Sequence, residues 1–263
     1  MMAFIQENEN GLIYMRSDYI PARHLFTTRF GGVSEGEFAT LNLSVSRGDR
    51  PENVRENFRR VAALLDAGEN DCCVTRQVHG AEVRVVTEED KHRCLSPVPF
   101  EADGLVTATR GLPIFCFAAD CVPVLLCEAE AGVVAAVHCG WRSSTADILG
   151  VALGKMCALG AQPERVCAAI GPAIGACCFE TDRDVPDAIE AWLGSTERLV
   201  TRRPDGKYLV DLRAANARRL QRLGVPEGQI DVSDECTFCQ HDKYWSHRYT
   251  KGRRGIQAAG IVL

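Results

Sequence analysis

Four short apolar runs follow one another through the middle of the chain, and they constrain the fold more than any other feature. They are DGLVTA (103–108), LPIFCFAA (112–119), VPVLLC (122–127) and AGVVAAVH (131–138), with a fifth run, RVCAAIG, at 165–171. All are rich in branched apolar residues and bounded by Gly, Pro or Asp. Such runs are typical of buried strands. The sequence therefore predicts a β-structured centre.

Helical periodicity appears on both sides of this centre. The segment 50–68 places apolar residues three or four positions apart: Val54, Phe58, Val61 and Leu65. Asp49 before Pro51 provides a helix start signal, and a glycine ends the segment. The segments 143–160 and 211–224 show the same pattern and also end in glycine. Each of the three segments is predicted to be a helix.

Strands in the middle and helices at the flanks predict an α/β (α+β) fold, in which mixed β-sheets form a sandwich, rather than a regular doubly wound sheet. Because no linker, low-complexity tract or internal repeat interrupts the chain, residues 1–263 are expected to form a single domain. No glycine-rich phosphate loop of the dinucleotide or nucleoside-triphosphate type occurs, which argues against those cofactors.

Charge and hydropathy limit the partners. A formal net charge of -5 and a pI near 5.7 leave no basic footprint for nucleic acid, apart from the local stretch YTKGRRG at 249–255. No apolar run is long enough to cross a bilayer, and the N-terminal residues lack the pattern of a signal peptide. We therefore expect a cytoplasmic location, no membrane association and no nucleic acid, and infer no obligate protein partner.

The chain has 13 cysteines, an odd number in a long sequence, so most are expected to be reduced thiols. Cys116, Cys127, Cys157 and Cys167 lie within apolar runs and are predicted to be small buried hydrophobic residues.

Three other residues are candidate metal ligands. His138 ends one predicted strand, Cys121 lies between two others, and His79 follows the strand-like CCVTRQVHG. Two imidazoles and one thiolate suit a zinc site that keeps a fourth position open for water, the arrangement of catalytic zinc. From the residues alone, two core histidines and a buried thiol are the alternative reading.

Seven ordered motifs resemble one bacterial family. They are TTRFGGVSEGEFATLNLS, RQVHGAEV, ADGLVT, ADCVPVLL, AVHCGWR, AIGPAIGACCFE and CTFC followed by YWSHR. The chain is similar to the YfiH/laccase-domain family, the polyphenol oxidase family now described as purine nucleoside phosphorylases. This resemblance implies zinc bound by His79, Cys121 and His138. It also implies phosphorolysis of adenosine, inosine, guanosine and methylthioadenosine, and deamination of adenosine.

These reactions suggest roles for further residues. Cys121, His138 and Arg142 are the predicted catalytic residues, and Arg142 is expected to hold phosphate because its planar guanidinium grips oxyanions with two parallel hydrogen bonds. Arg29 is a further phosphate candidate, and Arg248 is a weaker one. A solvated charge or an ion pair is the alternative for each arginine.

Three polar residues complete the predicted substrate site. Gln77 is expected to hydrogen-bond a purine edge, Asn42 to contact ribose, and Glu180 to act as a general acid or base. Their alternatives are, in the same order, a loop-structural role, a backbone cap and an exposed carboxylate.

Two departures from the family pattern are visible. Cys139 and Ser143 stand where the family commonly has Ala and Gly, and Cys139 adds a thiol beside His138 that is expected to narrow the pocket. Ile256 stands where the family often has an arginine, with Arg253 or Arg254 as candidate replacements.

Three rival functions remain open. A copper-dependent polyphenol oxidoreductase needs several histidine-rich copper sets, whereas this chain has six histidines and no His-x-His, so copper is the less favoured metal. A hydrolase needs Cys121 as nucleophile, His138 as base and one further group that orients the histidine. A zinc-stabilised binding module needs a partner for the Cys236–Cys239 pair, and the adjacent Cys177 and Cys178 lack the usual ligand spacing.

Overall fold

All five apolar runs form strands in the computed structural model, which describes residues 4–91 and 96–263. The strands are β5 (Gly104–Thr107), β6 (Ile114–Ala118), β7 (Val122–Glu128), β8 (Val133–Cys139) and β9 (Cys167–Ile170). The predicted β-structured centre is therefore confirmed.

Four of these strands belong to a six-stranded mixed sheet. Its order is β13-β9-β7-β8-β5-β4, with β4 spanning Val83–Val85 and β13 spanning Ile230–Val232. The two edge pairs, β13/β9 and β4/β5, are parallel, and the pairs between them are antiparallel.

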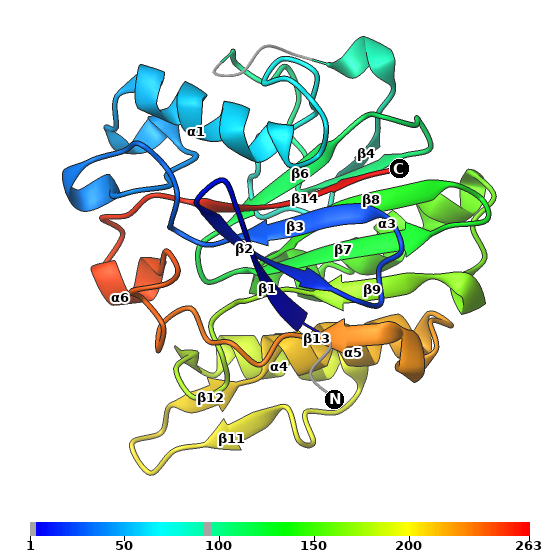
Figure 1. Ribbon diagram of the computed structural model, residues 1–263. Helices are drawn as coiled ribbons and strands as arrows, with labels where there is room; N and C mark the ends of the chain where they lie inside the picture. Colours follow the sequence, from blue (N-terminus) through cyan, green and yellow to red (C-terminus); the bar gives the residue numbers. More distant parts are fainter. Residues whose placement is uncertain (1–3, 92–95) are drawn as a thin grey trace.

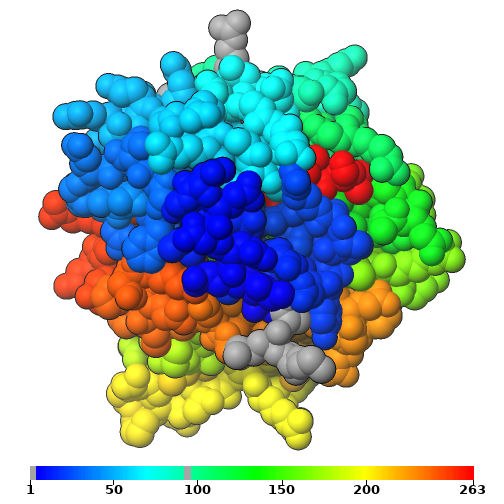
Figure 2. All heavy atoms as spheres, viewed as in Figure 1, coloured from blue at the N-terminus to red at the C-terminus, as the bar shows by residue number. Residues whose placement is uncertain are grey.

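A second, five-stranded antiparallel sheet has the order β1-β2-β3-β14-β6. It combines β1 (Phe4–Glu9), β2 (Leu12–Ser17) and β3 (Arg23–Thr27) with the C-terminal β14 (Gln257–Val262). The dark-blue N-terminal strands lie on the surface between the light-blue region and the orange C-terminal segment, so distant parts of the sequence meet there (Figure 2). None of the N-terminal strands was predicted from the sequence.

Alternating side chains along the strands divide the core into layers. On β8, Val134 and Ala136 pack between the two sheets with residues of β3, β6 and β14. Val133, Ala135 and Val137 alternate with them and belong to the core cluster on the helix side. The two sheets thus form the predicted sandwich, and its mixed α/β character is confirmed.

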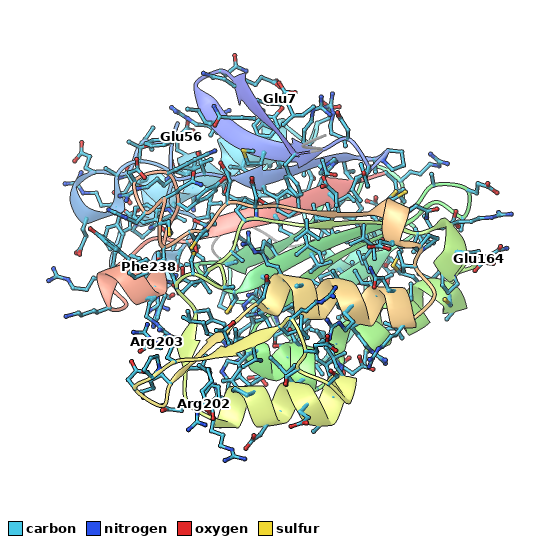
Figure 3. The ribbon with its side chains drawn as sticks, turned by 90° about the horizontal axis from the view of Figure 1, so that it is seen from below. Glu7, Glu56, Glu164, Arg202, Arg203 and Phe238 are labelled. Atoms are coloured by element: carbon cyan, nitrogen blue, oxygen red, sulfur yellow. The ribbon has the colours of Figure 1, made fainter. Side chains whose placement is uncertain are left out.

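Helices cover the outer faces (Figure 1). Helix α1 (Pro51–Ala63) packs on the five-stranded sheet, and α3 (Ile148–Ala158), α4 (Asp184–Leu193) and α5 (Leu212–Arg222) pack on the six-stranded sheet. Seen from below, Glu7 on β1 and Arg202, the last residue of β11 (Val200–Arg202), lie on opposite sides of these layers (Figure 3).

Short elements complete the described chain. A small antiparallel sheet contains β10 (Glu180–Thr181), β12 (Tyr208–Val210) and β11 (Val200–Arg202). Helices α2 (Trp141–Thr145) and α6 (His247–Thr250) are short. The 3₁₀ helices are η1 (Gly36–Phe38), η2 (Val45–Arg47), η3 (Glu88–Asp90), η4 (Pro163–Arg165) and η5 (Glu227–Gln229).

The predicted helix over 143–160 is two helices, α2 and α3. The break lies at Asp147, whose φ of 65° is left-handed and interrupts helical geometry. Its carboxylate accepts hydrogen bonds from Arg219 Nε at 2.7 Å and from Trp192 Nε1 at 3.2 Å. Contacts with α5 and α4 therefore stabilise a break that local periodicity did not predict.

Two smaller expectations are corrected. Asp49 does not cap α1, because its carboxylate accepts hydrogen bonds from Ser34 and Asn42 instead. Cys157, expected to be buried, is exposed on α3, since its position turns away from the sheet. Within residues 4–91 and 96–263, no helix combines the length and apolar character needed to span a bilayer.

Candidate functional site

Three candidate metal ligands reach one place from three separate segments. His138 is the penultimate residue of β8, Cys121 directly precedes β7, and His79 lies in the loop before β4. His138 continues the series Val134 and Ala136, so its ring lies on the side of the sheet that faces the second sheet. The neighbouring strand ends bring the other two residues to it.

The two loops that carry ligands contain left-handed backbone. His79 has a φ of 60°, and Asp120, directly before Cys121, has a φ of 83°. Non-glycine residues in this region cost about 1–2 kcal/mol each, and they persist only where surrounding contacts hold them. The segment with His79 is therefore not a strand of regular geometry, although isolated bridges pair Cys73 with Ile114 and Arg76 with Glu101.

The donor atoms of His79, Cys121 and His138 lie within 4.8 Å of one another. The two imidazole rings are nearly perpendicular, with centroids 4.9 Å apart. His138 is buried, Cys121 is half-buried and His79 is exposed, so the group opens to solvent on one side. The predicted trio is thus brought together as a candidate metal site.

Asp103 holds two of these ligands. His138 Nδ1 donates to its Oδ1 at 2.8 Å, and the backbone N–H groups of Val78, His79 and Gly80 donate to the same carboxylate at 2.9–3.0 Å. Burial favours the neutral carboxyl, but the hydrogen bonds outweigh it and lower the pKa of Asp103. Sequence reasoning missed this residue, because ADGLVT identified it only as the start of a strand.

The two histidines favour the ionised form of the Cys121 thiol. Burial alone raises the pKa of Cys121, but the charge and hydrogen bond of His138, together with those of His79, overcome burial and lower it to about 6. For His138, burial acts to lower the pKa, whereas Cys121 and Asp103 raise it to about 9. A thiolate beside histidine side chains is the form of cysteine that binds metal or attacks an electrophile.

Gly140 permits the close approach of the ligands. A Cβ at this position would lie 3.1 Å from His79 Cδ2 and 3.4 Å from Cys121 Sγ. A larger residue in place of the glycine of the VHCGW motif would therefore press against two of the three candidate ligands.

A cavity of about 360 Å³ adjoins the three ligands. Its volume is within the range of small-molecule sites. Its wall combines aromatic, cationic and ligand side chains: Arg47, Gln77, His79, Phe117, Ala118, Ala119, Asp120, Cys121, His138, Trp141, Ile174, Phe179, Leu212, His247, Arg248, Arg254 and Ile256.

Cationic groups gather on one part of this wall. Arg254 is buried, and its Nε has no hydrogen-bond partner, while its Nη1 donates to the Gly255 carbonyl at 2.9 Å. Burial and the charge of Arg47 lower the pKa of Arg254 to about 10, and burial and Arg254 lower the pKa of His247. Mutually repelling, incompletely paired cations beside a cavity favour an anion as ligand.

Asp120 lies between the cationic part of the wall and the candidate metal ligands. Its Oδ2 accepts a hydrogen bond from the backbone N–H of Arg248 at 2.6 Å, and its Oδ1 accepts one from Thr237 Oγ1 at 2.6 Å. Since Cys121 is the next residue, these contacts set the position of α6 relative to the thiol.

Two predicted substrate residues line the cavity. Gln77 Nε2 donates to the Phe117 carbonyl and its Oε1 accepts from the Phe117 N–H, each at 2.7 Å. The amide of Gln77 therefore positions Phe117, which fits the loop-structural alternative. Arg248 lies in the wall, and its Nη1 donates to the Glu180 carbonyl at 3.0 Å.

Arg29 and Asn42 lie outside the cavity wall. The Arg29 guanidinium donates to the carbonyls of Ala39 and His241 and lies 3.9 Å from the centroid of the Trp245 ring. Asn42 is buried, and its side chain hydrogen-bonds Ser44, Asp49 and Ile256. The polar groups of both side chains are thus engaged by contacts within the protein.

Arg142 and Glu180 also lie outside the wall. Arg142 is exposed on α2, with its guanidinium carbon 4.3 Å from the centroid of the Trp141 ring. The carboxylate of Glu180 pairs with Arg203 at 2.9 Å. The structure does not bring these two side chains to the three candidate ligands.

The departures from the family pattern fall on different sides of the sheet. Cys139 is buried in the core cluster on the helix side and does not line the cavity, because adjacent residues on a strand face opposite ways. Ile256 lies in the wall together with Arg254, one of the two arginines expected to replace the missing one. Arg47 was missed, since the sequence around it carries no signal beyond its charge.

Multi-copper chemistry does not match the candidate metal groups of the described chain. Residues 4–91 and 96–263 contain two groups of at least three candidate ligands, one with two histidines and one with cysteines only. Copper oxidase centres need several imidazoles in each set. The described residues therefore do not supply the ligand sets of a multi-copper oxidase.

Comparisons with known proteins agree with the predicted resemblance. The family model described as "Multi-copper polyphenol oxidoreductase laccase" matches residues 23–263. A protein of Deinococcus radiodurans named purine nucleoside phosphorylase is 38% identical over 253 residues, covering 96% of this chain and 94% of the relative.

Two further similarities cover almost the whole chain. A protein named adenosine deaminase RL5, from an unknown prokaryotic organism, is 35% identical over 243 residues, covering 90% of this chain and 92% of the relative. The crystal structure of hypothetical protein YfiH from Bacillus licheniformis aligns with a TM-score of 0.91 at 29% identity, covering 99% of this chain and 98% of that one. The chain belongs to the family described as multi-copper polyphenol oxidoreductase laccase, and its relatives include proteins named for purine nucleoside phosphorylase and adenosine deaminase.

Proposed function

We propose that this protein is a zinc-dependent purine nucleoside phosphorylase that also deaminates adenosine. The proposed substrates of phosphorolysis are inorganic phosphate with adenosine, inosine, guanosine or methylthioadenosine. One observation carries the proposal: the same cavity holds the His79, Cys121 and His138 donor set and the incompletely paired cation Arg254. The names of the relatives point to the same chemistry.

The donor set fits zinc. Two imidazoles and one thiolate are ligands that zinc accepts, and three protein ligands leave a position open. The Nδ1–H group of His138 hydrogen-bonds Asp103, which leaves Nε2 as the ring nitrogen that can bind the metal. This arrangement is usual for metal-bound histidine. When bound, zinc supplies Lewis acidity that activates water as a nucleophile at neutral pH, as deamination requires.

Phosphorolysis depends on the other groups of the wall. A phosphate oxygen forms a bond to the anomeric carbon of the sugar, the bond from that carbon to the purine nitrogen breaks, and the electron pair leaves with the purine. We assign the phosphate to Arg254, Arg47 and Arg248, whose guanidinium groups neutralise its charge and orient it. Arg142 and Arg29 are not carried into this role, because their side chains lie outside the wall.

Aromatic side chains supply the apolar part of the site. Phe117, Trp141 and Phe179 line the cavity, and we assign them to the faces of the purine ring. Gln77 orients Phe117 through two hydrogen bonds, so its contribution to purine binding is indirect.

Chromatography of purine nucleosides incubated with the protein tests this function. Free purine bases that appear only when phosphate is present support phosphorolysis, and inosine formed from adenosine supports deamination. Failure to convert any of the four nucleosides in zinc-replete protein contradicts the proposal. The cytoplasmic location remains a prediction, which fractionation of the native cells checks.

A cysteine hydrolase is the second candidate, favoured by a specific arrangement. Cys121 hydrogen-bonds His138, and His138 donates to Asp103, which gives the order nucleophile, base and orienting carboxylate. It uses the same residues as the metal site, so the two functions exclude each other. Turnover that survives complete removal of metal supports the hydrolase over the zinc enzyme.

A further inference from the structure

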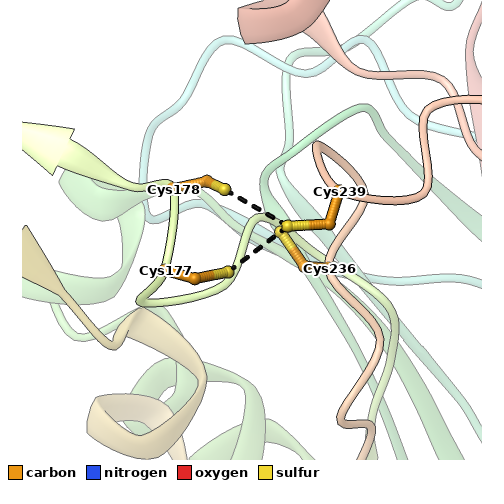
Figure 4. A group of neighbouring side chains, drawn as sticks. All are labelled: Cys177, Cys178, Cys236 and Cys239. Carbon is orange, nitrogen blue, oxygen red and sulfur yellow. Dashed lines mark hydrogen bonds between the residues drawn. The ribbon is translucent and has the colours of Figure 1, made fainter.

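A second group of candidate ligands consists only of cysteines and lies outside the cavity wall. Cys177 and Cys178 come from the loop between β9 and β10, and Cys236 and Cys239 come from the segment between β13 and α6. Figure 4 shows the four side chains converging from these two segments. Their sulfur atoms all lie within 4.8 Å of one another. We call this group the four-cysteine cluster.

The sulfur spacing matches metal ligation better than disulfide bonding. Cys239 Sγ lies 3.6 Å from Cys177 Sγ and 3.4 Å from Cys178 Sγ. With Zn–S bonds of about 2.3 Å, a regular tetrahedron separates its sulfurs by about 3.8 Å. The two sulfurs of a disulfide lie only about 2.05 Å apart. The two measured sulfur–sulfur distances are within a few tenths of an ångström of the separation in a zinc tetrathiolate.

Backbone contacts hold the two segments together. Ala173 forms a parallel bridge with Cys236, and Thr237 N–H donates to the Ala173 carbonyl at 3.0 Å. On the other segment, the N–H groups of Cys178 and Phe179 both donate to the Gly175 carbonyl at 2.9 Å. Regular backbone hydrogen bonding therefore sets the positions of the four sulfurs.

One sulfur already has the hydrogen bonds of a thiolate ligand. Gly175 N–H donates to Cys236 Sγ at 3.2 Å, and the N–H groups of Phe238 and Cys239 also hydrogen-bond this sulfur. The segment CTFC thus wraps its own first cysteine, as a Cys-x-x-Cys loop does when both of its cysteines bind one metal.

Gly175 and Arg213 lie beside the four-cysteine cluster, where the first allows close packing and the second supplies a positive charge. A Cβ at position 175 would lie 3.3 Å from Cys236 Cβ on the other segment and 3.0 Å from Arg213 Nη2, so glycine eases the approach of the two segments. Arg213 is buried, and its Nη1 donates to the carbonyls of Ser233 and Glu235. Its guanidinium charge offsets part of the net −2 charge that four thiolates and one Zn²⁺ carry.

From this geometry we infer that Cys177, Cys178, Cys236 and Cys239 bind one zinc ion as a closed tetrathiolate site. Each thiol releases its proton as its sulfur bonds the metal, and no electron is transferred. Four protein ligands leave no position for substrate, so the role of this zinc is structural. The sequence argued against this pairing because Cys177 and Cys178 are adjacent, but the fold brings both of them to the Cys236–Cys239 pair.

The site connects segments that support the cavity. Ile174 and Phe179, on either side of the first cysteine pair, line the cavity. Thr237, between the second pair, donates to Asp120. Phe238 lies beside α6, with its ring centroid 5.6 Å from that of Tyr249 (Figure 3). The zinc is thus expected to hold this side of the cavity together without contacting substrate.

Zinc content of the full-length protein tests the inference. Protein purified in reductant without added metal should contain about two zinc ions per chain, given one at each site. Cys239→Ser and Cys178→Ser should each lose about one ion and keep the ion of the His79 site. Cys157→Ser, which changes an exposed cysteine on α3, is the matched control and should lose none. Unchanged zinc content in Cys239→Ser overturns the inference.

Cobalt substitution in His79→Ala gives a readout that does not require altering the cluster. This variant keeps all four cysteines, so Co²⁺ should produce the intense sulfur-to-cobalt absorption of a tetrathiolate site. Absence of these bands, or a Cys178–Cys239 disulfide found by peptide mapping of the untreated protein, overturns the inference. If the proposed function fails because the His79 site holds no zinc, wild type should still contain about one ion, and Cys239→Ser should lose it.

Discussion

Asp103 Oδ1 accepts a hydrogen bond from the Nδ1–H group of His138, with 2.8 Å between nitrogen and oxygen, while three consecutive backbone N–H groups around His79 donate to the same carboxylate. One buried side chain thus orients a ligand on β8 and holds the left-handed loop that carries another. The contact between Asp103 and His138 joins the rigid sheet to the exposed side of the site.

We expect Asp103→Asn to lower zinc affinity at the His79 site by about 10- to 100-fold, the usual effect of losing a partner of a metal-bound histidine. The amide also places an N–H group among donors, which costs about 1–3 kcal/mol of stability. Zinc competition with a chromophoric chelator and thermal unfolding measure the two effects. Asp231→Asn, at another buried carboxylate, is the control and should lose stability without losing zinc affinity. Equal affinities in the two variants contradict the assignment of Asp103.

His79→Ala, Cys121→Ala and His138→Ala should each release about one zinc ion per chain and abolish nucleoside turnover. Three ligands from separate segments leave no replacement when one is removed. Elemental analysis of the folded variants measures the loss. His241→Ala, outside the cavity wall, serves as the control and should retain metal. Full retention in any of the three variants removes that residue from the set of ligands.

Arg254→Lys should raise the phosphate KM of phosphorolysis about tenfold or more and change the nucleoside KM little. The substitution keeps the charge but loses the planar guanidinium, which is buried in the wall and incompletely paired. Arg142→Lys provides the matched control, because this exposed arginine lies outside the wall. A raised phosphate KM in Arg142→Lys with none in Arg254→Lys transfers the role to α2.

Iodoacetamide should label Cys121 slowly in zinc-replete protein and rapidly after chelation. Because histidine contacts lower the pKa of Cys121 to about 6, the metal-free thiol is mostly ionised above pH 6 and protonated below it. Labelling of the chelated protein should therefore fall as pH decreases through about 6, whereas ordinary thiols lose reactivity near pH 9. Peptide mapping separates Cys121 from the exposed cysteines. Rapid labelling of Cys121 before chelation favours the cysteine hydrolase.

Local patterns predicted the central strands and three helical segments, because burial and period are properties of neighbouring residues. They failed at Asp147, where contacts with Arg219 and Trp192 stabilise a break between α2 and α3. The strands β1, β2 and β14 were not predicted either. Strand order depends on contacts between residues that are far apart in the sequence. For example, β14 near the C-terminus pairs with β3 near the N-terminus.

For the candidate site too, the sequence identified some residues that the structure brings together and others that it does not. His79, Cys121 and His138 were identified from residue type and family resemblance, and the structure brings their donor atoms together. Arg142 and Arg29 were chosen as arginines within recognisable motifs, but their guanidinium groups point to other partners. Proximity along the chain does not establish which side of a helix or loop a long side chain occupies.

By itself, the sequence determined the β-structured centre, the residue types of the candidate metal ligands and the family, since each is encoded in contiguous motifs. Only the tertiary structure decided that Asp103 orients His138, that Arg47 and Arg254 share a wall with the ligands, and that four cysteines from two segments converge. These relationships join residues that are far apart in the chain, and they arise because the packing of the two sheets brings loops from separate parts of the sequence to the same strand ends.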